Sequence, residues 1–362
     1  MTTDRSATPA PASASASGPA QPRLRQAWHV ACLSSALGAK PLQIHLFGDP
    51  IVIFRGAGGQ VGALLDRCPH RNVPLSMGQV VDGTLACGYH GWRFSPAGAC
   101  LHVPALIGEA GAEARRCAAF AVREQQGVIW IWGSADAAPT AEPFVFRLAD
   151  DPRYSTLRRR VEAEGSVHAV AENALDVPHT AFLHGGLFRV DAQRTEIRCE
   201  ITRTAESVAC EYIGEPRPSG LVGRVLSPSG GTVVHFDRFH LPGIAEVEYQ
   251  IGAENHILVQ AALTPASDHH TVVHAVISVR ARVPLFLVLP FAERVGYRIF
   301  GQDQAILREQ TATLRHFGEA RFVSTELDVL GPHILRLLRQ AERGERGPER
   351  AQPTTRTVSM RV

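Results

Sequence analysis

The sequence predicts an α+β protein in which an all-β domain precedes a larger domain, where helices cover one face of an antiparallel sheet. Short apolar runs separated by turn-forming residues fill the region from residue 23 to about 135. Farther along, alternating apolar and polar residues give way to helical periodicity from about residue 291. The length of 362 residues also fits two domains, which we place at 23–140 and 141–345.

The first domain follows residues 1–22, which are rich in Ala, Ser and Pro and which we expect to form a disordered tail. This tail lacks the apolar stretch of a secretory signal. Strands are expected where apolar and β-branched residues gather, at Trp28–Leu33, Pro41–Phe47, Ile51–Phe54, Val61–Leu65 and Gly127–Trp132. A stretch rich in Pro and Ala near Ala137–Pro143 is the expected linker.

The second domain is expected to open with a helical stretch at Val167–Leu183 and to continue with strands at Val233–Phe236, Val247–Tyr249, Ile257–Val259 and Thr271–Val279. Their alternation fits an antiparallel sheet with one buried face. The apolar run Val283–Phe291, interrupted by two prolines, is interpreted as a buried strand or turn. Further helices are predicted at Phe291–Phe317 and Ile334–Glu342, and residues 346–362 are predicted to form a polar tail.

Composition argues against several classes of protein. A formal net charge of +2 disfavours a nucleic-acid-binding protein that neutralises phosphates broadly. No run approaches the roughly 18 apolar residues of a membrane-spanning helix. Seven scattered cysteines are too few for a disulfide scaffold in a chain of this length. We therefore expect a cytoplasmic protein that neither binds nucleic acid nor spans a membrane.

Cysteine and histidine occur together twice in the first domain, as Cys68-Pro69-His70 and as Cys87 with His90. Two loop tips could therefore each offer one thiolate and one imidazole. Such a set binds a [2Fe–2S] cluster with the histidines on one iron and the cysteines on the other, which raises the reduction potential. Structural zinc is the alternative, but neither pair has the usual Cys-x₂₋₄-Cys or His-x₃₋₅-His spacing. The cluster is therefore the preferred interpretation.

A second group of potential ligands extends from Glu172 to His184. Glu172, Asp176 and His179 stand at i, i+4 and i+7, so one helix face could carry all three. His179 and His184 reach one metal ion only if the helix ends or bends between them, and Pro178 favours such a break. Two histidines and one carboxylate form the facial triad of non-haem Fe(II) oxygenases, which leaves positions open for dioxygen and substrate.

These motifs together resemble the Rieske non-haem iron oxygenases, specifically the terminal oxygenase (alpha) component of the short homotrimeric type. The resemblance covers residues 27 to 320 and rests on the motifs Cys68-Pro-His70-Arg, Cys87-Gly-Tyr-His90-Gly-Trp and Glu172-Asn-x-x-Asp-x-x-His179-x₄-His184. It implies a helix-grip (START-like) second domain. The implied cofactors are a Rieske [2Fe–2S] cluster on Cys68, His70, Cys87 and His90, and mononuclear Fe(II) on His179 and His184.

The resemblance also implies a third iron ligand from a late helix. The segment Gly301-Gln-Asp303-Gln-Ala-Ile306 is similar to the corresponding segment of the family, and Asp303 matches the ligand. Asp328 and Asp237 are the weaker alternatives.

The family further implies that three subunits form a ring, in which Asp176 bridges His179 and His90 of the partner subunit. That bridge would be the electron route between cluster and iron, because the two sites in one chain would lie too far apart.

The implied enzyme takes electrons from a ferredoxin and/or flavin reductase, indirectly from NAD(P)H, and uses O2 as co-substrate. Its substrate is expected to be small and hydrophobic, aromatic or steroid-like. The pocket walls are expected to be inward residues of the sheet together with Phe182, Leu183, Leu187 and Phe188. His235 or His240 could also reach the substrate pocket.

The short chain favours monooxygenation, as hydroxylation or oxidative demethylation, over ring cis-dihydroxylation. Two alternatives from other classes remain at this point. One is a non-enzymatic Rieske electron carrier with a ligand-binding domain, and the other is a zinc-stabilised binding module.

Overall fold

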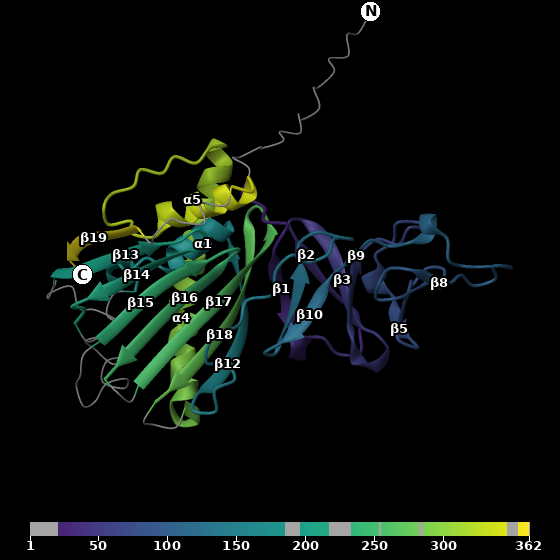
Figure 1. Cartoon of the computed structure of the whole chain (residues 1–362), viewed down its shortest axis with the longest axis horizontal. Helices are drawn as coiled ribbons and strands as arrows, with labels where there is room; N and C mark the ends of the chain where they lie inside the picture. Colours follow the sequence, from purple (N-terminus) through teal and green to yellow (C-terminus); the bar gives the residue numbers. More distant parts are fainter. Residues whose placement is uncertain are drawn as a thin grey trace, which may run out of the picture.

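The structure is a computed structural model that describes residues 21–184, 196–216, 233–252, 255–281, 285–345 and 354–361. Small β-sheets formed by the first part of the chain lie beside one large sheet, and helices pack against one face of that sheet (Figure 1). This architecture confirms the predicted fold class. The described helices include none that is both long and apolar enough to cross a bilayer.

The first region contains three small antiparallel sheets. The first sheet has the order β1 (Trp28–Leu33), β11 (Val128–Trp132) and β10 (Val122–Gln125). The second has the order β2 (Leu42–Leu46), β3 (Asp49–Arg55), β4 (Val61–Leu65) and β9 (Ala119–Phe120). The third has the order β5 (Gln79–Val81), β6 (Thr84–Ala86), β7 (Arg93–Phe94) and β8 (Cys100–His102). Short 3₁₀ helices stand at Ser34–Ala36, Ala57–Gly59, Leu75–Met77 and Glu113–Arg115.

Strand β3 is buried on both faces, which explains its unbroken apolar sequence. Ile51 and Ile53 pack in a core with residues of the first sheet. Val52 and Phe54 point the other way, into a second core shared with residues of the third sheet. This second core also contains both cysteines of the paired motifs, so the loops that carry them rest on a packed apolar base.

The large sheet has eight strands in the order β12-β18-β17-β16-β15-β14-β13-β19, and all neighbouring strands are antiparallel. The strands are β12 (Ser155–Glu164), β13 (Glu196–Arg203), β14 (Ser207–Ile213), β15 (Val233–His240), β16 (Ile244–Ile251), β17 (Asn255–Ser267), β18 (His270–Arg280) and β19 (Thr354–Arg361). The described helices are α1 (Val167–Ala174), α2 (Thr180–Leu183), α4 (Leu285–Phe317) and α5 (Gly331–Glu342).

Both faces of the large sheet take part in cores. Leu307 of α4 and Leu337 of α5 pack with Ile201 of β13 on the helical side. On the other side, Trp130 of the first region packs with Ile244 of β16. Each fully buried side chain of this size contributes about 1.5–3 kcal/mol to stability. The sheet is therefore a fixed platform, and residues from its helical side can form a site with the helices.

The polar tail predicted at residues 346–362 is wrong for its second half. Residues Thr354–Arg361 form β19, which pairs antiparallel with β13 and closes that edge of the sheet. Val358 and Met360 are buried in the helical-side core. With only two apolar positions among eight residues, the alternation was too sparse to indicate a strand.

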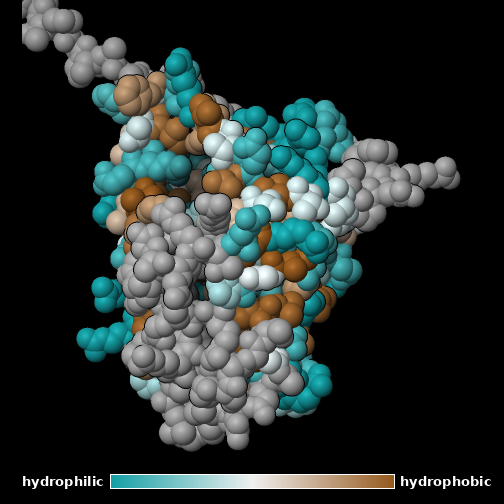
Figure 2. Space-filling view, turned by 90° about the vertical axis from the view of Figure 1, so that its left-hand side faces the viewer, coloured by the Kyte–Doolittle hydropathy of each residue, from teal (hydrophilic) through white to brown (hydrophobic). Residues whose placement is uncertain are grey.

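Figure 2 shows the side of the molecule on which β19 lies in Figure 1. Hydrophilic residues and smaller hydrophobic patches share this surface.

One strand or turn prediction and one helix prediction also need correction. The run interpreted as a strand or turn at Val283–Phe291 belongs to α4 from Leu285 onward, and Pro290 lies inside this helix. Pro290 stands so near the start of the helix that its missing N–H removes only one of the first hydrogen bonds. The helix expected at Val167–Leu183 is divided into α1 and α2. Residues 1–20 and 346–353 of the predicted tails lie outside the described residues, and the predicted boundary at 140/141 falls between β11 and β12.

Candidate metal centres

Two tight loops present the Cys68 and Cys87 side chains to each other. The first loop follows β4, where the Cys68 N–H donates to the Val73 carbonyl at 2.9 Å. The second follows β6, where the Cys87 N–H donates to the Trp92 carbonyl at 2.8 Å. Gly91 has a φ of +69°, a conformation that glycine adopts without strain and that turns this loop back. Both loops are therefore set by their backbones.

Buried cysteine thiols in these loops need a positive charge to become thiolates. Cys68 and Cys87 are only 1% and 4% exposed. Burial, together with the neighbouring Cys87 thiol, raises the pKa of Cys68 to about 11. A metal ion or cluster supplies the charge that binds both as thiolates.

The two histidines of the paired motifs also face each other. The ring centroids of His70 and His90 lie 4.5 Å apart, and the His70 ring stacks on Trp92 at 4.7 Å. The Nδ1 atom of His70 is buried and finds no hydrogen-bond partner in the described chain. Because a buried polar atom is rarely left unpaired, this nitrogen fits a metal ligand. The loops thus bring all four predicted residues together around one position.

The second predicted group also comes together, at the break between α1 and α2. His179 immediately precedes α2 and His184 immediately follows it, and their Nε2 atoms lie 3.3 Å apart. Asp303 of α4 places Oδ1 at 3.6 Å from Nε2 of His179 and 3.2 Å from Nε2 of His184. Their ligand atoms all lie within 4.8 Å of one another. Two imidazole nitrogens and one carboxylate oxygen that converge in this way form the ligand set of the facial triad, so the set fits a bound metal ion.

The other ring nitrogen of each histidine is oriented by an acceptor. Asp176 accepts hydrogen bonds from the backbone N–H of His179 at 3.0 Å and lies 3.2 Å from Nδ1 of that ring. Gln302 Oε1 lies 2.9 Å from Nδ1 of His184. Burial lowers the pKa of His179, but the carboxylates of Asp176 and Asp303 outweigh burial and raise it to about 9. Such partners fix the tautomer and hold Nε2 toward the metal position.

Sequence reasoning missed Gln302, although it stands next to Asp303 in the segment on which the third ligand was predicted. The weaker carboxylate alternatives are not part of the triad. Asp328 accepts from the Thr325 N–H in a turn at 2.6 Å, and Asp237 pairs with His235. The expectation that one continuous helix face carries Glu172, Asp176 and His179 is wrong, because α1 ends at Ala174.

A cavity of about 340 Å³ opens beside this triad, between the helices and the sheet. Its lining includes inward sheet residues, as predicted, namely Val247, Tyr249, Ile251, Ile257 and Val259. The predictions for Phe182 and Leu183 are wrong, because neither lines the cavity, and Phe182 is 77% exposed. Thr180 does line the cavity. Phe182 stands two residues later, which turns its side chain by about 200° to the other side of the helix. Leu187 and Phe188 lie outside the described residues.

Comparison with protein families accounts for both halves of the chain. Residues 27–110 match the Rieske [2Fe-2S] domain, and residues 164–344, half of the chain, match the vanillate O-demethylase oxygenase C-terminal domain. The chain belongs to the Rieske oxygenase family. The first match confirms the predicted Rieske [2Fe–2S] cluster as a cofactor, in place of zinc. The four paired Cys and His residues lie within the matched range.

Individual relatives agree with this assignment. The oxygenase component of dicamba O-demethylase from Stenotrophomonas maltophilia is 35% identical over 205 residues, which span 56% of this chain and 60% of that protein. The vanillate O-demethylase oxygenase subunit of Pseudomonas sp. (strain HR199 / DSM 7063) is 27% identical over 87% of this chain and 93% of its own length. The chloroplastic protein TIC 55 of Pisum sativum is matched over only 49% of its length.

A solved structure supports the fold of the whole Rieske oxygenase chain. The crystal structure of dicamba monooxygenase bound to 3,6-dichlorosalicylic acid superposes with a TM-score of 0.71 and 25% identity. The superposition covers 89% of this chain and 98% of that one.

Proposed function

We propose that this Rieske oxygenase is the terminal oxygenase of a multicomponent system. It receives electrons from a ferredoxin and/or flavin reductase that oxidises NAD(P)H, and it uses O2 to hydroxylate or oxidatively demethylate a small hydrophobic molecule. The observation that carries the proposal is the His179–His184–Asp303 triad, which stands beside a largely apolar cavity in a chain with a Rieske domain. A bare electron carrier would have no need for this triad.

The chain offers one residue set for each cofactor. Cys68, His70, Cys87 and His90 would hold the [2Fe–2S] cluster, and His179, His184 and Asp303 would hold Fe(II). When bound, these groups supply one-electron transfer and dioxygen chemistry. The protein's own part is to orient the ligands, to hold the substrate against the triad and to exclude water from the apolar cavity.

Electron transfer is proposed to cross between subunits of a homotrimer. The sheet that carries the second cluster loop, with β5 and β8, lies at one end of the molecule and well away from α1 (Figure 1). His90 is exposed, and the Asp176 side chain keeps 28% of its surface accessible. A carboxylate that already binds His179 and still reaches the surface can accept a hydrogen bond from His90 of the partner subunit. Light scattering should give about three times the chain mass of 39.2 kDa.

Names of relatives support demethylation over dihydroxylation. Two of the relatives described above are O-demethylase components. The 3-chlorobenzoate-3,4-dioxygenase oxygenase subunit of Comamonas testosteroni, 30% identical over 68% of this chain, favours ring dihydroxylation as the second candidate. We place the enzyme in the cytoplasm, because none of the seven cysteines, all of them within the described residues, forms a disulfide, and because the proposed reductase draws on NAD(P)H.

The proposed electron route is tested by Asp176→Asn. This substitution keeps the shape of the side chain and removes the negative charge that bridges the two histidines. With both metal sites filled, a pre-reduced cluster should be reoxidised about 10–100-fold more slowly in the presence of substrate and O2, by analogy with the loss on removing partners of metal-bound histidine.

The matched control is Asp268→Asn, which removes a surface carboxylate paired with Arg23. It should reoxidise its cluster at the wild-type rate. A wild-type rate in Asp176→Asn, with iron and sulfide contents unchanged, would contradict the proposed route.

A further inference from the structure

A second group of ionisable side chains lines the same cavity as the metal triad. Glu215 follows β14, and His235 and Asp237 lie two residues apart on β15, so their side chains share the inner face of the sheet. We refer to these three residues as the acid–histidine subsite. All three are buried. His235 was only expected to be near a substrate pocket, and Glu215 was not expected at all.

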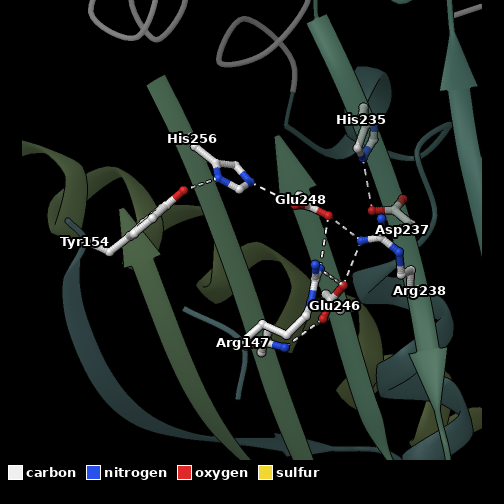
Figure 3. A network of polar contacts seen from close by, with 9 residues as sticks. Arg147, Tyr154, His235, Asp237, Arg238, Glu246, Glu248 and His256 are labelled. Carbon is white, nitrogen blue, oxygen red and sulfur yellow. Dashed lines mark hydrogen bonds and ion pairs between the residues drawn. The ribbon is translucent and has the colours of Figure 1, made fainter. Parts of the chain in front are cut away.

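Both ring nitrogens of His235 meet a carboxylate. Nδ1 lies 2.6 Å from Glu215 Oε2, and Nε2 lies 3.0 Å from Asp237 Oδ1, a contact drawn in Figure 3. The ring is also held by its faces, since it stacks on Tyr212 at 4.5 Å and on Tyr249 at 4.0 Å. A side chain restrained on both edges and both faces is preorganised. It will not rotate away to make room for a ligand.

The geometry fixes the number of protons in the subsite. A neutral imidazole has one N–H and could donate to only one of the two carboxylates. Either the ring is an imidazolium between two carboxylates, or it is neutral and one acid is protonated. Both arrangements have a total charge of −1. Burial lowers the pKa of His235, but Asp237 and Glu215 outweigh burial and raise it to about 9, so this extra proton is present at neutral pH.

Arginine side chains on the other face of the same strands do not neutralise the subsite. Arg238 follows Asp237 on β15 and points to the opposite side, where it donates to Glu246 at 2.7 Å and to Glu248 at 2.5 Å. Arg147 reaches the same two carboxylates (Figure 3). The outer face therefore balances its acids with two guanidinium groups. Among the described residues that line the cavity there is no Arg or Lys.

A ligand in this cavity would meet apolar walls and a negatively charged polar group. Val247, Ile257 and Val259 offer an aliphatic surface, which suits the body of an aromatic molecule. A carboxylate of the ligand near the subsite would be repelled at low local dielectric. A hydrogen-bond donor would be favoured, because carboxylate oxygens accept several hydrogen bonds each.

We propose, building on the proposed oxygenase function, that the acid–histidine subsite selects the substrate class: small, mainly apolar molecules that carry an amine or another N–H or O–H donor and no carboxylate. The donor is recognised by the carboxylates of Glu215 and Asp237, and His235 holds those carboxylates in place. The reacting part of the molecule then lies toward the metal triad, which lines the same cavity.

Four ligands of one shape test the proposal: 4-methoxybenzylamine, 4-methoxybenzyl alcohol, 4-methylanisole and 4-methoxybenzoate. Binding to the oxidised holoenzyme is measured by calorimetry at pH 7, without reductase. At least one of the two donors should bind about tenfold or more tightly than 4-methylanisole, and the benzoate should bind most weakly. A tighter amine identifies a cationic donor, whereas an equal or tighter alcohol identifies a neutral one. The proposal is overturned if the benzoate matches the donors, or if neither donor binds better than 4-methylanisole.

Substitutions then locate the preference. Asp237→Asn and Glu215→Gln should each reduce the donor preference by about tenfold and weaken the discrimination against the benzoate. Glu248→Gln, on the outer face of the sheet, is the matched control and should keep the wild-type ranking. An unchanged ranking in both subsite variants would contradict the proposal. These are equilibrium measurements, so failure of NAD(P)H-dependent turnover would count against the oxygenase function and not against the subsite.

Discussion

The cluster loops and the iron triad differ in how the chain builds them. Both cluster loops belong to the first region, are closed by their own backbone hydrogen bonds and rest on one apolar core. The triad combines His179 and His184, which flank α2, with Asp303 of α4. Strands β13 to β18 of the large sheet stand between α2 and α4 in the sequence. The first site therefore depends on local loops, whereas the second depends on the packing of distant elements. If this difference holds, each site should be removable without the other.

Removal of a cluster ligand gives the largest expected effect. Cys87→Ser should lose nearly all acid-labile sulfide and visible colour, because serine is a poor replacement for the thiolate that the cluster requires. The triad should still bind added Fe(II). Sulfide analysis and Fe(II) titration measure the two outcomes. Cys100→Ser, in the same core, is the control and should keep its sulfide. Loss of Fe(II) binding in Cys87→Ser would show that the sites are not independent.

Removal of the carboxylate from the triad is the reciprocal change. Asp303→Ala should bind about one iron fewer per chain, keep the colour and spectrum of the cluster, and lose turnover by roughly 1,000-fold or more, because two histidines alone do not complete the triad. Asp328→Asn should retain the full iron content. If Asp303→Ala keeps all of its iron, then the third ligand is another residue.

A smaller effect is expected at the residue that orients His184. Gln302→Leu removes the acceptor for Nδ1 of that ring and should weaken iron binding by about 10–100-fold, with the cluster unaffected. Gln302→Glu keeps an acceptor at this position and should bind iron nearly as the wild type does. Equal iron affinity in Gln302→Leu and the wild type would mean that Gln302 is not needed to orient the ring.

The smallest effect concerns stability near the triad. Burial, together with the nearby carboxylates of Asp328 and Asp176, raises the pKa of Glu172 to about 7. Because the folded pKa lies above the unfolded value, the folded protein binds the extra proton, and stability falls as pH rises from about 4.5 through 7.

Glu172→Gln should therefore stabilise the protein at pH 8 by roughly 1–3 kcal/mol and much less at pH 5. Urea unfolding at both pH values measures this difference. An equal effect at pH 5 and pH 8 would show that Glu172 does not titrate in this range.

The sequence was most informative where ligands lie close together along the chain. The spacing of the Cys and His pairs predicted the cluster, and the His179–His184 spacing predicted a break in the helix. Asp303 was found by resemblance, because no local pattern joins it to histidines on another helix. The acid–histidine subsite could not be predicted from the sequence, since Glu215 meets His235 only through strand pairing. Phe182 was wrongly predicted to line the pocket, because the sequence does not show which side of the short helix α2 faces the cavity.

The central claim is that one chain holds a Rieske cluster and a separate mononuclear iron. Iron, zinc and acid-labile sulfide are therefore to be counted per chain on anaerobically purified protein, together with a visible spectrum. We expect about three irons and two sulfides, with the red-brown colour of a Rieske cluster, after Fe(II) is supplied. Two irons and two sulfides that do not increase with added Fe(II) would contradict the triad as an iron site. Zinc without sulfide would contradict both sites.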